Sequence, residues 1–209
     1  MTQADGRPLC HAGFMTPANT TGPGGTTLYY GDLNTPHVLQ VFLELRDRAS
    51  RTMSENLLQT FRQAADEGKL VVKFHFAATI DDTVGGIGSQ RGLSALAAAA
   101  DVGQKEFVDY LSALFAAQPF PPVDDKFSET SELLSQAGKV VGLRSAEFDR
   151  KVTDNVYLNW AGETVGSFSS FGVIGTPVLW YDGEVIPVVN ADGESLALTP
   201  QEFLSELQK

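Results

Sequence analysis

The chain has 209 residues, of which 43% are apolar and 10% aromatic, so it is long enough and apolar enough to bury a substantial core. Its formal net charge of −11 excludes nucleic acid and anionic membrane surfaces as general partners. No stretch approaches the roughly 20 apolar residues of a membrane span, and the N-terminal region lacks the pattern of a signal peptide. We therefore expect no membrane partner and a cytoplasmic location.

Cys10 is the only cysteine in the chain, so no internal disulfide can form. This agrees with the cytoplasmic expectation, because the cytosol keeps thiols reduced. We interpret Cys10 as an incidental thiol, with a redox-sensing thiol or an intermolecular disulfide as the alternatives. His11, His37 and His75 lie far apart in the sequence and show no metal-ligand spacing, so we expect no metal.

The first secondary-structure elements are predicted to be strands that follow an irregular tail. Residues 1–25 are rich in glycine, proline, threonine and asparagine and have no hydrophobic period, which is typical of a tail. Thr26–Tyr30 is a short β-prone run. Val38–Leu45 is apolar enough to be a strand that is buried on both faces, and we take it as the central strand.

A strand–helix–strand unit is predicted next. Residues 49–67 carry one apolar stripe at helical spacing, and Gly68 provides a C-terminal cap. Residues 70–76 alternate and predict a strand, with His75 opposite the apolar set and therefore half-exposed. Short connections favour a parallel pair with a right-handed crossover. The stripe consists of Met53, Leu57, Phe61 and Ala65.

Residues 87–170 are predicted to be helical almost throughout. Residues 93–102 are rich in alanine, and a second apolar stripe covers residues 107–115. The segment Gly85-Gly86-Ile87-Gly88 is not a phosphate-binding loop, because it lacks the spacing of a dinucleotide fingerprint and has no Gly-Lys-Ser sequence. We interpret it as a flexible entry to the helical segment.

Residues 171–189 predict a hairpin that begins at an unusual corner. Gly175-Thr176-Pro177 precedes an apolar run, and Asp182-Gly183 separates this run from a second one. Proline cannot donate to a sheet, so Pro177 marks the first residue of a strand, an edge or a special backbone such as a cis bond. Residues 199–202 form a capping box that begins a final helix.

This order of elements indicates an α/β chain with a thioredoxin-like fold and an inserted all-helical domain. The predicted organisation is an N-terminal tail over residues 1–25, a thioredoxin-like domain over 26–82 and 171–209, and a helical insertion over 83–170.

The chain resembles the DsbA-like branch of the thioredoxin superfamily from about Tyr29 to its C-terminus. Residues 41–45 resemble the strand that leads into the active-site helix, Ser89 begins a helical block of the right length, and residues 172–177 resemble the cis-proline loop. The resemblance places the family's Cys-Pro-x-Cys motif on Asp47-Arg48-Ala49-Ser50, so both cysteines are absent. Thiol–disulfide exchange needs an attacking thiolate and a resolving thiol, and this motif supplies neither.

Asp47 has two interpretations at this position. As the N-cap of the helix it would accept backbone N–H bonds and contribute about 1 kcal/mol to stability relative to alanine. As part of a binding site it would lie beside Ser50 and a basic cluster of Arg46, Arg48 and Arg51 at a helix N-terminus suited to anions. The arginines could instead make exposed ion pairs, which contribute little.

Three functions remain open. The first is a non-redox module that binds an extended peptide or a partner protein between Asp47, Arg48, Ser50 and the Thr176-Pro177 loop, without a cofactor. The second is a transferase or isomerase that uses glutathione or another low-molecular-weight thiol. The resemblance to glutathione-dependent relatives implies Ser50 for this role, although their serine corresponds in position to Asp47. The third is a structural homo-oligomer, for example a homodimer whose interface includes the tail.

Overall fold

The computed structural model describes residues 10–11, 14–190 and 195–207. A mixed six-stranded sheet lies at its centre, in the order β3-β4-β6-β5-β7-β8. The central strands β5 and β6 run parallel, while β4, β7 and β8 pair antiparallel with their neighbours. The strands are β3 (Thr20–Thr21), β4 (Thr27–Tyr30), β5 (Val38–Glu44), β6 (Val71–Ala77), β7 (Val178–Tyr181) and β8 (Glu184–Ile186).

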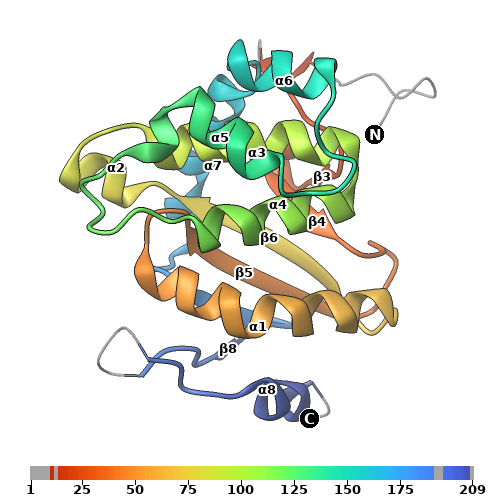
Figure 1. Cartoon of the computed structure of the whole chain (residues 1–209). Coiled ribbons are helices and arrows are strands. Elements are labelled where there is room, and N and C mark those ends of the chain that lie inside the picture. The colour runs from red at the N-terminus through yellow and green to blue at the C-terminus, as the bar shows by residue number, and fades with distance from the viewer. Residues whose placement is uncertain (1–9, 12–13, 191–194, 208–209) are drawn as a thin grey trace.

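Helices separate the two halves of this sheet along the chain. Helix α1 joins β5 to β6, helices α2 to α7 all lie between β6 and β7 in the sequence, and α8 follows β8. Figure 1 shows the block from α3 to α7 above the sheet, with β8 and α8 at the lower end. The helices are α1 (Arg48–Asp66), α2 (Thr79–Val84), α3 (Gly88–Val102), α4 (Gln104–Ala116), α5 (Thr130–Ala137), α6 (Ala146–Thr153), α7 (Leu158–Ser167) and α8 (Pro200–Glu206), with short 3-10 turns at Pro23–Gly25, Lys126–Ser128 and Phe168–Phe171.

This arrangement confirms the thioredoxin-like fold. The predicted strands and the first helix are present with ends that differ by one residue, except that β8 ends at Ile186 instead of residue 189. The predicted helical segment consists of the separate helices α3 to α7, with loops between them. Gly68 has a φ of 68° directly after the first helix, as its C-capping role requires. Thr199 and Glu202 form the predicted capping box. No helix in the described residues is long and apolar enough to span a membrane.

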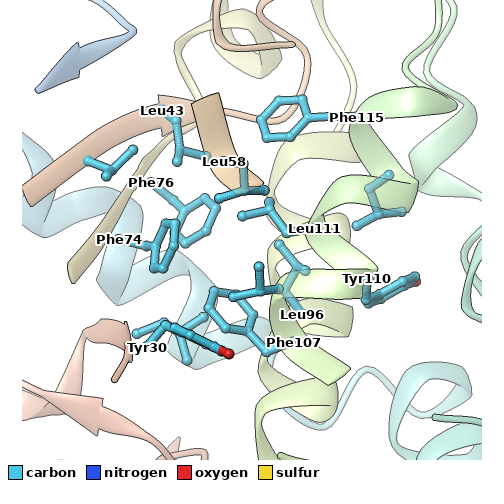
Figure 2. Close-up of a cluster of buried hydrophobic side chains, with 14 of the residues drawn as sticks. Tyr30, Leu43, Leu58, Phe74, Phe76, Leu96, Phe107, Tyr110, Leu111 and Phe115 are labelled. Carbon is cyan, nitrogen blue, oxygen red and sulfur yellow. The ribbon is translucent and has the colours of Figure 1, made fainter. Parts of the chain in front are cut away.

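One hydrophobic core joins the sheet to the helical segment. Along β5 and β6 the registers Val41↔Phe74 and Leu43↔Phe76 place large side chains on one face of the sheet. Helices α1 and α4 cover this face, and Figure 2 shows Phe74 and Phe76 beside Leu111 and Phe115 of α4. The helical segment therefore does not pack as a separate body, because its buried side chains belong to the same cluster as those of the sheet.

Residues 14–25 are folded against the helical segment, which differs from the expected irregular tail. The backbone N–H of Ala18 donates to Asp101 Oδ1 at 2.8 Å, and Trp160 Nε1 donates to the carbonyl of Gly25 at 2.8 Å. Strand β3 also pairs with β4. These contacts use backbone groups, which leave no hydrophobic period in the sequence. The rest of the expected tail, residues 1–9 and 12–13, lies outside the described part, as does the side chain of Cys10.

His75 is buried, so the expectation of a half-exposed sheet residue is wrong. Its ring stacks on Phe42 at 4.6 Å and lies 4.3 Å from the ring of Phe171. Its Nε2 lies 3.2 Å from the Oε1 of Gln40. The turn Phe168–Phe171 covers this part of the second sheet face, and the burial lowers the pKa of His75 to about 4.

Candidate functional site

Asp47 caps the N-terminus of α1, as the sequence predicts. Its Oδ2 accepts the backbone N–H of Ser50 at 2.9 Å, and its Oδ1 accepts that of Ala49 at 3.2 Å. The free N–H groups and the dipole of a helix start favour a negative charge at this place. The residue as a whole is half-buried.

Thr176 connects the second half of the site to Asp47. Its hydroxyl donates to Asp47 Oδ2 at 3.0 Å, and the following Thr176–Pro177 peptide bond is cis, which confirms that interpretation of the corner. The fold thus brings together the motif position on β5–α1 and the loop before β7, which the sequence analysis selected independently. Pro177 itself is buried beneath Thr176 and the exposed Gly175.

The side chain of Ser50 is buried and forms its hydrogen bonds within the protein. The residue has 0% relative exposure. Its hydroxyl donates to Asp47 Oδ2 at 2.6 Å and accepts the backbone N–H of Glu44 at 3.1 Å. Ala49 is also buried. Ser50 therefore supports the position of Asp47 and offers no exposed hydroxyl to a ligand.

The three arginines near Asp47 do not form a basic cluster, and this expectation is wrong. Arg46 is 1% exposed and turns into the protein, where Nη1 lies 2.7 Å from Asp81 Oδ1. Arg51 pairs with Glu55 at 2.7 Å on the exposed face of α1. Arg48 places its guanidinium over the ring of Phe120, 5.2 Å from the centroid. The sequence could not distinguish these directions, because neighbouring residues at a helix start point to different sides.

Arg46 holds together two loops that flank the start of α1. It donates to the carbonyl of Gly85 at 3.0 Å and to the carbonyl of Pro122, and it lies 3.3 Å from Asp125 Oδ1. Gly85 follows α2, while Pro122 and Asp125 belong to the loop between α4 and α5. Figure 1 shows α2 and this loop on the side of the molecule where α1 begins.

The glycine-rich segment before α3 is held by Asp125, so its interpretation as a flexible entry is wrong. Asp125 accepts the backbone N–H groups of Ile87 at 3.0 Å and Gly88 at 2.9 Å. A Cβ on Gly88 would lie 2.2 Å from Asp125 Oδ1, and one on Gly86 would lie 2.4 Å from Oδ2. Glycine is therefore needed here so that the carboxylate can approach the backbone.

Glu44, at the end of β5, is a buried acid that the sequence analysis did not select. It accepts the backbone N–H groups of Ile80 at 2.7 Å and Thr79 at 3.1 Å. Burial, together with the charges of Asp47 and Asp81, raises its pKa to about 7, against the opposing effect of the two N–H bonds. The available signal was an acid at the end of an otherwise apolar strand.

Exposed apolar side chains lie on the segments that are bonded to the start of α1. Ile174 is 98% exposed on the loop before Pro177, and Phe120 is 66% exposed beside Arg48. Gln118 fixes the Phe120 loop to the site, because its Nε2 donates to the carbonyls of Leu45 at 2.8 Å and Asp47 at 2.9 Å. We call the exposed apolar residues of these loops the apolar rim. It consists of Val84, Ile87, Phe120, Val123 and Ile174.

The backbone beside Asp47 also has unused hydrogen-bonding groups. Among the described residues, no acceptor bonds to the N–H of Gly175 or of Thr176. Gly175 is exposed and Thr176 half-exposed, and both precede the first residue of β7. An extended segment could pair with such groups as an added strand does.

The structure contains a cavity of about 450 Å³ at the other end of the sheet. It lies where β5 begins, whereas Asp47 lies just beyond the end of β5. The cavity is therefore separate from the candidate site. The cavity is lined by Pro36, His37, Gly68, Lys69, Tyr181, Leu204 and Leu207.

No cluster of metal-ligating side chains occurs in the described part of the chain.

Comparisons with known proteins agree with this architecture. A family model described as Thioredoxin matches residues 24–203. A search of curated proteins gives no match.

The similar solved structures include bacterial oxidoreductases. The reduced disulfide bond oxidoreductase DsbG from Mycobacterium tuberculosis aligns with a TM-score of 0.69 at 16% identity, covering 92% of this chain and 84% of that chain. BdbD from Bacillus subtilis aligns with a TM-score of 0.69 at 12% identity, covering 92% and 97%. The thiol-disulfide oxidoreductase MdbA from Actinomyces oris aligns with a TM-score of 0.69 at 16% identity, covering 87% and 84%.

Proposed function

Because this chain belongs to the thioredoxin family but has only one cysteine, outside the motif position, we propose that it binds an extended polypeptide segment without thiol chemistry. The observation that carries the proposal is the hydrogen bond from the hydroxyl of Thr176 to Asp47. It places the half-buried Asp47 beside backbone N–H groups that have no acceptor among the described residues.

The exposed apolar side chains support this binding role. Soluble proteins tend to keep large apolar patches covered, and exposed ones often mark interaction sites. The residues of the apolar rim lie on three segments that are bonded to Arg46, Asp47 or its neighbours, so apolar side chains of a bound segment would contact the rim near this carboxylate. Backbone pairing at Gly175 and Thr176 would supply affinity, and the rim would supply selectivity for apolar residues.

The two alternatives have less support from the geometry. A cofactor thiolate would need an exposed donor, whereas Ser50 is buried and its hydroxyl bonds to Asp47 and Glu44. Asp47 would also repel a thiolate placed beside it. A homo-oligomer remains a hypothesis, and light scattering on full-length and tail-truncated protein would test it.

The proposal can be tested with the full chain and a peptide probe. Fluorescein-labelled insulin B chain with alkylated cysteines is an extended apolar segment, and we expect it to bind with a rise in fluorescence anisotropy. Ile174→Asp should weaken this binding about fivefold or more, because it places a charge in the apolar rim. Val141→Asp is the matched control, because Val141 is 87% exposed but lies outside the rim.

Two results would contradict the proposal. One is the absence of binding, or binding that Ile174→Asp and Val141→Asp reduce equally. The other is reduction of insulin disulfides by the purified protein, since the proposed site contains no thiol.

A further inference from the structure

The Asp47 carboxylate has capacity for one more hydrogen-bond donor. Its Oδ2 already accepts three donors, the backbone N–H and hydroxyl of Ser50 and the hydroxyl of Thr176. Within the described part of the chain, its Oδ1 accepts only the N–H of Ala49, at the longer distance of 3.2 Å. Each oxygen of an ionised carboxylate has about two lone-pair positions, so Oδ2 is more than filled, whereas Oδ1 with its one donor has a second position. Asp47 as a whole residue is half-buried, so it is not closed off from solvent.

The cations near Asp47 are engaged elsewhere. Arg46 is buried against Asp81 and Asp125, and Arg51 pairs with Glu55. Arg48 lies over the ring of Phe120. A charge-assisted bond to the open oxygen must therefore come from outside this set of arginines.

Further carboxylates lie on the loops that carry the apolar rim. Asp82, on α2 near Val84, is exposed and makes no hydrogen bond or ion pair within the described residues. Asp124 follows Val123 and is exposed, with Lys126 at 3.5 Å. The chain as a whole carries a net charge of −11. This charge distribution attracts a cationic ligand and repels an anionic one.

We propose that the bound segment carries a lysine or arginine opposite Asp47, with apolar residues on either side of it. This inference rests on the proposed function and adds a rule for selecting the ligand. The basic side chain donates to the open Asp47 oxygen, while its apolar neighbours contact the rim. Asp47 is thus a specificity-determining residue, in addition to its role as the cap of α1.

Three matched peptides test this rule. They share valine and leucine around a central residue, which is lysine, glutamine or glutamate, and their affinities for the full chain are measured by fluorescence anisotropy. The lysine peptide should bind about fivefold tighter than the glutamine peptide, a preference of the size expected for a part-exposed charge pair. The glutamate peptide should bind weakest, and salt should reduce the advantage of lysine.

Asp47→Asn removes the negative charge but keeps the N-cap of α1, because asparagine is also a good N-cap. This variant should lose the preference for the lysine peptide over the glutamine peptide. Glu163→Gln, an exposed change on α7, is the control for net charge and should keep the preference. Thermal unfolding of each variant establishes that it is folded. If Asp47→Asn fails to fold, loss of the lysine preference in high salt is the second measurement.

The outcomes distinguish this rule from the proposed function. If none of the peptides binds, both the proposed function and this inference fail. If all three bind equally, or if lysine is still preferred in Asp47→Asn, the inference is overturned and the binding role stands.

Discussion

At the scale of single residues, Asp47 connects the two halves of the site. Its carboxylate holds the first turn of α1 through Ala49 and Ser50, and it holds the loop before β7 through Thr176. The backbone bonds belong to one helix, but the bond to Thr176 joins segments that are distant in sequence. Asp47 therefore contributes to both local and tertiary stability.

Replacing Asp47 with alanine should destabilise the protein by about 2 kcal/mol, because both the cap and the bond to Thr176 are lost. Asp47→Asn should cost less than half of this, since asparagine can still accept hydrogen bonds from the helix start and from Thr176. Urea unfolding of the two variants measures the difference. Equal losses would show that the hydrogen bonds to this side chain do not determine its contribution.

At the scale of elements, the loops around the site depend on Arg46 and Asp125. Arg46 joins the end of α2 to the loop between α4 and α5, and Asp125 joins that loop to the start of α3. These elements carry four of the five side chains of the apolar rim. The rim is therefore positioned by buried ionic contacts, while its own apolar side chains remain exposed.

Arg46→Met should destabilise the protein by about 3–5 kcal/mol, because it leaves Asp81 as a buried charge without its partner. Hydrogen exchange should rise at residues 84–88 and 120–125, which lose their common anchor. The double variant Arg46→Met with Asp81→Asn should recover part of the loss, because the uncompensated charge is removed. A double variant that is no more stable than Arg46→Met would contradict this account.

At the scale of the whole molecule, two buried groups give the stability opposite pH dependences. The pKa of Glu44 is raised to about 7. Its contribution to the free energy of unfolding is therefore present below about pH 4.5 and is lost as the pH rises through 7. The pKa of His75 is lowered to about 4, so its contribution is present above about 6.5 and is lost as the pH falls through 4. Between about pH 4.5 and 6.5 the two effects offset each other.

Single substitutions should separate these two pH dependences. Glu44→Gln should leave a free energy of unfolding that falls with decreasing pH between 6.5 and 4, and His75→Phe one that falls with increasing pH between 4.5 and 7. In each variant the free energy of unfolding should change by about 3 kcal/mol across the stated pH range, because the pKa of the remaining group differs by about 2.5 units between the folded and unfolded states. Urea unfolding across this pH range is the measurement. Profiles parallel to that of the unmodified protein would refute the assignment.

The sequence by itself determined the order of strands and helices, the N-cap at Asp47, the corner at Pro177 and the absence of motif cysteines. Apolar periodicity and capping residues act over a few neighbouring positions, so these features are visible without the fold. The resemblance to the DsbA-like branch placed the two halves of the site at Asp47 and Thr176.

Only the tertiary structure decided the directions of the arginines, the burial of Ser50 and His75, and the folding of residues 14–25. Each of these depends on what distant segments place beside a residue. Arg46 meets Asp81 and Asp125, and Trp160 meets the backbone of Gly25. Contacts of this kind leave no periodic trace in the chain, because long-range packing and backbone hydrogen bonds do not require a repeating side-chain pattern.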